Sequence, residues 1–267
     1  MLLCVDVGNS QTALGLFNGE RLVRTWKVAT EERRTADEWM VLLRGLLREV
    51  GEPYDATGLD RDGLPATGIA VCSTVPMVLN EIRQVLTRSF GSVPHLVVEP
   101  GVRTGVAVDV DNPREVGTDR IMNSLAASTL YGGPAIVVDV GTATTFDVVG
   151  KGGEYLGGAI APGVEISLEA LGRRGAQLRR VELARPRSVI AKNTVEALQS
   201  GAVFGFAAQI DGVVTRMVAE LGVPRSDLTV VATGGLAPVV LAECTEVDEH
   251  EPALTLIGLR LVFERNS

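Results

Sequence analysis

Two copies of one acidic, glycine-bearing segment lie 133 residues apart in a chain of 267 residues. The segment VDVGNSQT covers Val5–Thr12 and the segment VDVGTATT covers Val138–Thr145, with five of the eight positions identical. In each copy an aspartate precedes a glycine by two residues, and hydroxyl side chains follow. Backbone N–H groups of such a turn can bind phosphate oxygens, and the carboxylate can hold a cation that neutralises phosphate charge. The two segments therefore predict a clamp for a nucleoside triphosphate.

Each segment taken alone is also consistent with an ordinary hairpin that carries an aspartate in its turn. Two copies at half-chain spacing, each opening a run of three expected strands, favour the phosphate-binding interpretation. No P-loop lysine follows the glycines in either copy, so the segments do not predict a P-loop enzyme.

A second group of residues between the two copies could carry acid–base chemistry. The stretch EPGVRTGVAVDVDNPREVGTDRIMN, at Glu99–Asn123, places Asp119 beside Arg120 at the expected start of a helix. Asp119 could take a proton from a substrate hydroxyl, and Arg120 could hold a carboxylate or phosphate. The alternative, in which Thr118 or Asp119 only caps the helix, stays open on these residues alone.

Three further segments lie where a strand ends or a helix begins. GGAIAPG, at Gly157–Gly163, is consistent with a plain strand–turn–helix junction. In AKNTVEALQSG, at Ala191–Gly201, a capping box begins at Asn193, so Thr194 can lie at a helix start for structural reasons alone. In VVATGGLA, at Val230–Ala237, two glycines after an apolar strand would let a flat adenine-like ring approach the backbone.

The remaining reactive residues predict no site. The arginines of RRGAQLRR are expected to form a solvated face, and His95 and His250 have no partner nearby in the sequence. The three cysteines lack the spacing of a metal site. Cys4 and Cys72 lie in apolar runs, which predicts small buried side chains in a reducing compartment.

Composition narrows the class of protein. Hydrophobic residues make up 46% and charged residues 22% of the chain, which is typical of a globular protein, and the length favours two domains. The net charge of −8 argues against nucleic acid as a general partner. Neither a basic leader nor an uncharged run of about 20 apolar residues is present, which predicts a cytoplasmic protein without a membrane segment.

The elements that must position these residues alternate in the same order in both halves. Strands are expected at 2–7, 13–17, 22–28, 68–72, 95–98, 135–140, 145–149, 154–161 and 228–232. Helices are expected at 36–50, 78–90, 120–130, 163–171, 194–221, 238–243 and 252–264, and a surface loop at 51–67. This order predicts an α/β fold with two helix-covered sheets. Two such domains facing each other would leave a cleft between the repeated turns.

Taken together, the segments resemble the motifs of the type III pantothenate kinases over nearly the whole chain. DVGNSQT is similar to the first phosphate motif of that family, DVGTATTFD to its second, and ATGGLA to its adenosine motif. PGVRTG and DNPREVGTDRIMN are similar to its pantothenate motif. The resemblance implies ATP-dependent phosphorylation of pantothenate to 4′-phosphopantothenate, the first step of coenzyme A biosynthesis.

The resemblance also implies a fold and an assembly. The implied fold is that of the acetate kinase, actin and hexokinase superfamily, with two duplicated ribonuclease-H-like domains around a central cleft. Here these domains would be residues 1–118 and 119–267, with a last helix that can pack across the boundary. The implied assembly is a homodimer with the pantothenate pocket near its interface.

Site residues follow from the match of each motif. Asp119 is the implied catalytic base on the pantothenate hydroxyl. Asp6 would hold Mg²⁺, and Asp139 would bind a monovalent cation, K⁺ or NH₄⁺. The implied ATP contacts are Asp6, Val7, Gly8, Asn9, Ser10, Gln11, Thr12, Ala13 and Thr142. The implied substrate contacts are Gly117, Thr118, Asp119, Arg120 and Thr194.

Departures from the family pattern are few, and two other functions fit the sequence less well. Ser10 stands where many members have threonine, which keeps the hydroxyl, and no residue matches the aromatic that members often place near the start of the substrate motif. A sugar kinase of the same superfamily is disfavoured by the segment DNPREVGTDR. A non-catalytic regulatory relative is disfavoured by the intact motif acids and by the lack of a basic helix-turn-helix segment.

Overall fold

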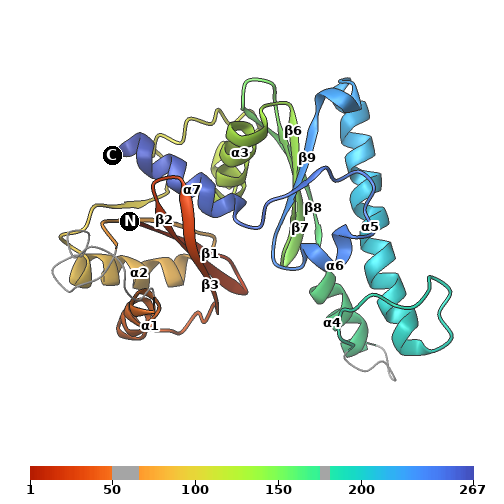
Figure 1. The fold of residues 1–267 in the computed structure, drawn as a ribbon, viewed down its shortest axis with the longest axis horizontal. Coiled ribbons are helices and arrows are strands. Elements are labelled where there is room, and N and C mark those ends of the chain that lie inside the picture. Colours follow the sequence, from red (N-terminus) through yellow and green to blue (C-terminus); the bar gives the residue numbers. More distant parts are fainter. Residues whose placement is uncertain (50–65, 175–180) are drawn as a thin grey trace. The chain divides into compact units, whose positions relative to one another are not determined.

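The computed structural model describes residues 1–49, 66–174 and 181–267, and the chain separates into two compact units (Figure 1). The first unit comprises residues 1–105, 114–126 and 255–267, and the second comprises residues 106–113 and 127–254. The chain passes between the units on both sides of the segment 106–113, within helix α3 (Thr118–Tyr131), and at the first residues of helix α7 (Leu254–Asn266). The division into domains 1–118 and 119–267 stays a prediction.

The first unit is built on a five-stranded sheet with the order β3-β2-β1-β4-β5. Strands β1 (Leu2–Val7), β2 (Gln11–Asn18) and β3 (Arg21–Ala29) form an antiparallel meander. Strand β4 (Gly68–Ser73) pairs with β1 in parallel, and β5 (His95–Val97) pairs with β4 in parallel.

Helices cover both faces of this first sheet. Helices α1 (Ala36–Arg48) and α2 (Pro76–Ser89) lie on one side of β1–β3, and α7 lies on the other (Figure 1). The apolar residues of β1 that face α1 and α2 share one core with Trp39 and Ile82. On the other face, the guanidinium of Arg260 in α7 lies 5.9 Å from the ring centre of Phe17. The aspartate of β1 points to this second face, because side chains alternate along a strand.

The second unit repeats the same sheet topology, with the order β10-β9-β6-β7-β8. Strands β6 (Ala135–Val140), β7 (Ala143–Val149) and β8 (Tyr155–Pro162) form an antiparallel meander. Strands β9 (Thr229–Thr233) and β10 (Glu249–His250) extend it in parallel. Each strand of one sheet thus has a counterpart in the other, which supports the predicted duplication.

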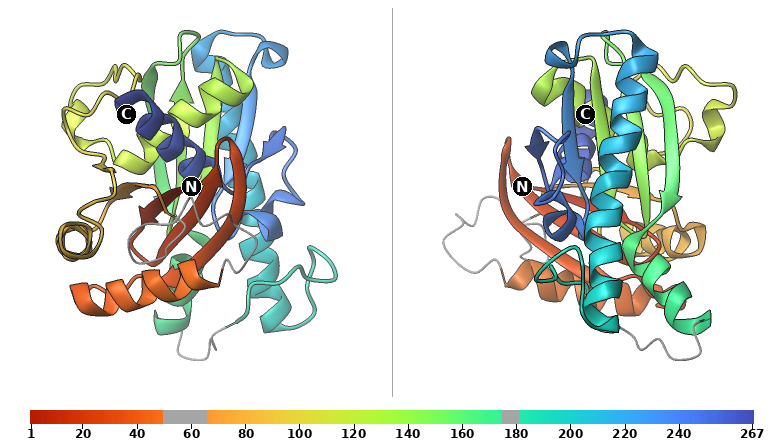
Figure 2. Two further views of the ribbon diagram at one scale, coloured as in Figure 1. Left: turned by 60° about the vertical axis from the view of Figure 1, so that its left-hand side comes forward. Right: turned by 90° about the vertical axis from the view of Figure 1, so that its right-hand side faces the viewer.

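One face of the second sheet carries three helices. Helices α4 (Val164–Arg174), α5 (Thr194–Leu221) and α6 (Ala237–Leu241) share a core with alternate residues of β6 and β7. Figure 2 shows α5 running along this sheet. On the other face, the N–H of Tyr155 donates to the carbonyl of Ala107 at 2.8 Å.

Most of the expected elements are confirmed, with boundaries that differ by a few residues. Strands at 2–7 and 135–140 and the helix at 194–221 have the predicted bounds. The other predicted strands and helices are present with shifted ends, whereas the short strand β10 was not predicted. Two short 3₁₀ turns, Pro113–Glu115 and Arg225–Asp227, were not predicted either. The expected loop at 51–67 lies almost wholly outside the described residues.

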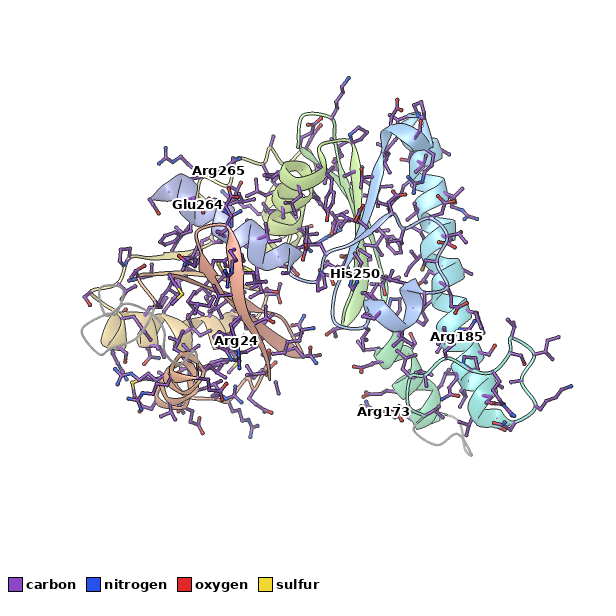
Figure 3. The ribbon with its side chains drawn as sticks, viewed as in Figure 1. Arg24, Arg173, Arg185, His250, Glu264 and Arg265 are labelled. Carbon is purple, nitrogen blue, oxygen red and sulfur yellow. The ribbon has the colours of Figure 1, made fainter. Side chains whose placement is uncertain are left out.

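Both histidines and Arg173, which predicted no site, lie at the surface. His95 and His250 are exposed, and Figure 3 shows His250 on β10. Arg173 of the arginine-rich segment is exposed on α4, where it pairs with Glu169 at 3.3 Å. Surface pairs of this kind contribute little to stability.

Helix α5 is long and apolar enough to cross a membrane by length and composition alone, which is weak evidence for a single helix. Ala202, Ile210 and Val214 of α5 are buried in the core of the second unit. The carboxylate of Asp211, near its middle, accepts hydrogen bonds from Thr245. These contacts are those of a core helix.

Candidate functional site

The first repeated turn joins β1 to β2. The N–H of Gly8 donates to the carbonyl of Gln11 at 3.1 Å, and this bond closes the turn. Thr12 is fully buried, and its hydroxyl pairs with that of Thr30 at 2.8 Å, so its side chain belongs to the core. The exposed residues of the turn are Asn9, Ser10 and Gln11. Of the predicted ATP contacts, these three present their side chains to solvent, while Val7 and Thr12 are buried.

The second repeated turn is one residue shorter. The N–H of Gly141 donates to the carbonyl of Ala143 at 3.0 Å. Asp139 therefore lies opposite Thr145 in the strand register, whereas Asp6 lies opposite Ala13. The two turns, which look equivalent in sequence, place different side chains beside their aspartates.

Asp6 and Asp119 lie near the same buried thiol in the first unit. Cys72 pairs with Asp6 in the register of β4 and β1, and its Sγ donates a hydrogen bond to Asp6 Oδ1 at 3.3 Å. Burial raises the pKa of Cys72 well above its ordinary value, and the charges of Asp6 and Asp119 raise it further. Both carboxylates are therefore within electrostatic reach of one side chain.

Asp119 lies in the first turn of α3 and is mostly buried. Its Oδ1 accepts a hydrogen bond from the N–H of Arg120 at 2.9 Å. Burial raises the pKa of Asp119 above its ordinary value, and the hydrogen bond from Arg120 and the charge of that residue lower it by less. A carboxylate with a raised pKa is a stronger proton acceptor, as a general base requires.

Gly117 fixes the place of this carboxylate. A Cβ at Gly117 would lie 2.4 Å from Asp119 Oδ1, closer than side chains tolerate. The backbone of Gly117 is not in the left-handed region, so a side chain here would be opposed by the contact with Asp119 and not by the backbone conformation. Gly117 is thus better explained as room for Asp119 than as a flexible turn.

The other predicted substrate contacts lie in both units. α3 begins at Thr118, so Thr118 and Asp119 lie inside the helix rather than before it. The Thr118 hydroxyl is buried and has no hydrogen-bond partner among the described residues, which leaves it available to a ligand. Thr194 is exposed at the start of α5 in the second unit, directly after Asn193, whose Oδ1 accepts from the N–H of Glu196 at 2.9 Å. The predicted N-cap is confirmed, and the pantothenate contact of Thr194 stays a prediction.

Two glycine-bearing segments meet at the second turn. Gly234 has a φ of 99° and no space for a side chain. A Cβ at this position would lie 2.5 Å from the Val140 carbonyl oxygen and 2.6 Å from Asp139 Oδ1. A Cβ at Gly163 would lie 2.2 Å from the Thr142 carbonyl oxygen. The segments ATGGLA and GGAIAPG therefore both approach the backbone of DVGTATT. Three segments distant in sequence form one oxygen-lined end of the second sheet.

The donor sets suit the expected cations to different degrees. Within residues 1–49, 66–174 and 181–267, no three His, Cys, Asp or Glu side chains gather to hold a metal ion. Asp6 offers a single carboxylate, and Mg²⁺ at a nucleotide usually takes only one or two protein carboxylates together with phosphate oxygens. At the second turn, the carboxylate of Asp139 and the carbonyl of Val140 converge on Gly234. Carbonyl and carboxylate oxygens of this kind can replace the hydration shell of a monovalent cation.

The sequence interpretation missed three residues near these aspartates. Cys72 was predicted as a small buried side chain, which it is, but it also donates to Asp6. Thr145 was expected only as one of the hydroxyl donors of the second turn, and Asp147 was given no role, although Thr145 lies opposite Asp139. The order of the strands was the available signal, since it places Cys72 next to Asp6 in a parallel pair.

Comparison with known proteins identifies relatives along the whole chain. The family model described as type III pantothenate kinase matches residues 2–216. Proteins named type III pantothenate kinase from Nocardioides sp. and Streptomyces avermitilis are 65% and 62% identical to this chain. They cover all of this chain, and the alignments cover 99% and 98% of their own lengths. A protein of the same name from Thermobifida fusca is 61% identical, with both chains fully covered.

Solved structures agree on the fold. A protein from Campylobacter jejuni described as a Baf family transcriptional activator superposes with a TM-score of 0.58 at 17% identity, covering 99% of this chain and 98% of its own. The ROK hexokinase of Thermus thermophilus gives 0.51 at 15% identity, with coverage of 100% and 99%. The polyphosphate/ATP-glucomannokinase of Arthrobacter gives 0.52 at 13%, with coverage of 100% and 99%. At these identities the likenesses show a shared fold, and they bear out the predicted α/β fold with two sheets.

Proposed function

This chain belongs to the type III pantothenate kinase family, and we propose that it transfers the γ-phosphate of ATP to pantothenate with Asp119 as the base. Phosphorylation of pantothenate in coenzyme A biosynthesis is the activity for which its full-length relatives are named. Identities of 55–65% over the full chain carry that activity to this enzyme. The observation that best supports the catalytic proposal is the mostly buried Asp119 carboxylate with its raised pKa.

Asp119 and its neighbours would act on pantothenate. Asp119 takes the proton of the attacking hydroxyl as the new oxygen–phosphorus bond forms and the bond between the γ-phosphorus and ADP breaks, so the nucleophile does not become a cationic oxygen. Arg120 holds the pantothenate carboxylate with its planar guanidinium. The unpaired hydroxyl of Thr118 donates to the substrate, and Thr194 is a further proposed substrate contact. Gly117 keeps the Asp119 carboxylate in place.

The first turn would bind ATP. Asn9, Ser10 and Gln11 expose their side chains there, and backbone N–H groups of a turn of this kind can bind phosphate oxygens. Asp6 holds Mg²⁺, whose bound charge offsets the phosphate charge that builds up during transfer. Positioning and charge neutralisation are most of what phosphoryl transfer asks of a protein. Thr142 contributes from the second turn.

Asp139 would bind K⁺ or NH₄⁺. The support is the convergence of its carboxylate with the Val140 carbonyl at Gly234. We also propose that the enzyme is a cytoplasmic homodimer with its active site near the interface. Ile160, Val189 and Ile190 of the second unit are largely exposed apolar side chains, as an interface would use. Light scattering coupled to size exclusion would detect the dimer.

A substrate panel tests this function. Purified protein is incubated with ATP, Mg²⁺ and K⁺, and with pantothenate or a set of hexoses and N-acetylhexosamines. We expect 4′-phosphopantothenate from pantothenate and no phosphorylated sugar. Sugar phosphorylation without turnover of pantothenate would instead favour a sugar kinase of the same fold. If the protein neither hydrolyses ATP nor transfers phosphate to any of the acceptors, the result would favour a regulatory relative.

A further inference from the structure

Thr145 and Asp147 form a hydrogen-bonded pair on the face of the second sheet that carries Asp139. Thr145 lies directly opposite Asp139 in the antiparallel register of β6 and β7. Side chains opposite each other in such a pair have Cβ atoms about 4.5–5.5 Å apart. The hydroxyl of Thr145 donates to Asp147 Oδ2 at 3.2 Å. Asp147 stands two residues further along β7 and therefore shares this face.

Asp147 is a buried acid with no part in the proposed reaction. Its exposed fraction is 0%, although carboxylates are rarely buried without a reason. A carboxylate can only accept hydrogen bonds, so the single proton of the Thr145 hydroxyl is committed to Asp147. The lone pairs of the Thr145 oxygen are then left for a group beside Asp139. An oxygen that cannot donate suits a cation and does not suit a phosphate.

We infer that Thr145 is a ligand of the monovalent cation at Asp139, and that Asp147 is the residue that turns the Thr145 oxygen toward it. The inference rests on the proposed cation site and adds two residues to it. Asp139, the Val140 carbonyl and Thr145 would then offer three oxygens to the ion. Asp147 is a positioning residue, since it acts through Thr145.

The first turn shows why the two copies would bind different partners. Its extra residue places Ala13, which has no oxygen in its side chain, opposite Asp6. The corresponding threonine, Thr12, points into the core instead. Only the second copy therefore sets a hydroxyl oxygen beside its aspartate. A change of one residue in turn length moves the side chain to the other face.

Thr144 is a matched control in the same strand. It is fully buried on the opposite face, and its hydroxyl has no hydrogen-bond partner in the part of the chain that the structure describes. Thr144→Val removes the same atom as Thr145→Val, one residue away. Any difference between the two variants therefore reports the face of the sheet and not the loss of a hydroxyl as such.

The test measures cation binding with and without turnover. The melting temperature is compared in KCl and in choline chloride at equal ionic strength, because an ion that binds only the folded state raises it. The K⁺ concentration for half-maximal rate is measured at saturating ATP and pantothenate. We expect Thr145→Val to abolish the K⁺-dependent rise and to raise the half-saturating K⁺ about 10–100-fold, the usual effect of losing a supporting shell. Asp147→Leu, which cannot accept the Thr145 proton, should act in the same direction, and Thr145→Ser and Thr144→Val should stay near wild type.

Each outcome decides a separate claim. An unchanged K⁺ requirement in Thr145→Val, or a wild-type protein stabilised equally by choline and K⁺, overturns the inference. A K⁺-dependent rise that Thr145→Val removes, in a protein that does not phosphorylate pantothenate, upholds the cation site and refutes the proposed function. If Asp147→Leu fails to fold, the contrast of Thr145→Val with Thr145→Ser decides the role of the hydroxyl.

Discussion

Replacement of Gly117 by alanine would displace the Asp119 carboxylate without touching its chemistry. The new Cβ would start 2.4 Å from Asp119 Oδ1. The oxygen must move by about 0.6 Å to reach 3.0 Å and by about 1.0 Å to reach an ordinary contact of 3.4 Å. A displacement of about 1 Å at a reacting group can lower a rate about 100-fold. We therefore expect kcat of Gly117→Ala to fall about 100-fold at saturating ATP and pantothenate.

A coupled ATP-consumption assay measures this effect, with Gly45→Ala as the control. A Cβ at Gly45, in α1 of the same unit, would meet no atom within 4 Å, so this variant should keep its kcat and gain about 0.5–1 kcal/mol of stability. The effects of Gly117→Ala and Asp119→Asn on kcat should also be coupled. Gly117→Ala should lower kcat far less in the Asp119→Asn background than in the wild type. A kcat for Gly117→Ala within about threefold of wild type, with normal folding, would refute the role given to this contact. Additive losses in the double variant would refute it as well.

Two further variants and one titration test other parts of the site. Gly234→Ala should destabilise the second unit by more than about 1–2 kcal/mol, because the φ of 99° and the Asp139 oxygen both oppose a Cβ. Calorimetry measures this loss, and an unchanged melting temperature would contradict it. Asn193→Ala should cost about 1 kcal/mol through loss of the α5 cap, a fall of about 2–4 °C in melting temperature, with Lys192→Ala as an exposed neighbour that should have no effect. The fall of kcat/KM for pantothenate on the acidic side of its pH profile should occur at a higher pH than for an ordinary aspartate. Burial raises the pKa of Asp119, and the protonated acid cannot accept a proton. If Asp119→Asn leaves this fall unchanged, the titrating group is another residue.

The sequence patterns predicted the fold because most strands of both sheets are apolar runs that end at turn residues. Apolar runs that end in Asp-x-Gly gave the bounds of β1 and β6, and Asn193 marked the start of α5. Strand β10 was missed because it is held by polar groups instead of an apolar pattern. Asp248, just before it, accepts from the N–H of Val230 at 2.8 Å and from Arg225 at 2.9 Å.

The site could be predicted as a set of residues but not as an arrangement. Thr12 and Thr145 stand six residues after their aspartates, yet they lie on different faces relative to those aspartates because the first turn has one more residue. The identical spacing of aspartate and threonine in the two copies gave no sign of this difference. The burial of Asp119 and its contact with Gly117 depend on tertiary packing, which no local pattern encodes.

The Asp119→Asn variant tests the central claim most directly. Burial raises the pKa of this carboxyl in the folded state, so its contribution to stability is fully present below the unfolded pKa and is lost as pH rises through the folded pKa. An uncharged asparagine avoids the cost of burying a charged carboxylate at neutral pH. Its side-chain oxygen can still accept the hydrogen bond from the Arg120 N–H, so the melting temperature should not fall. Formation of 4′-phosphopantothenate, followed by mass spectrometry with ATP, Mg²⁺ and K⁺, should fall about 10²–10⁴-fold. A folded Asp119→Asn enzyme that phosphorylates pantothenate at the wild-type rate would contradict the assignment of Asp119 as the base.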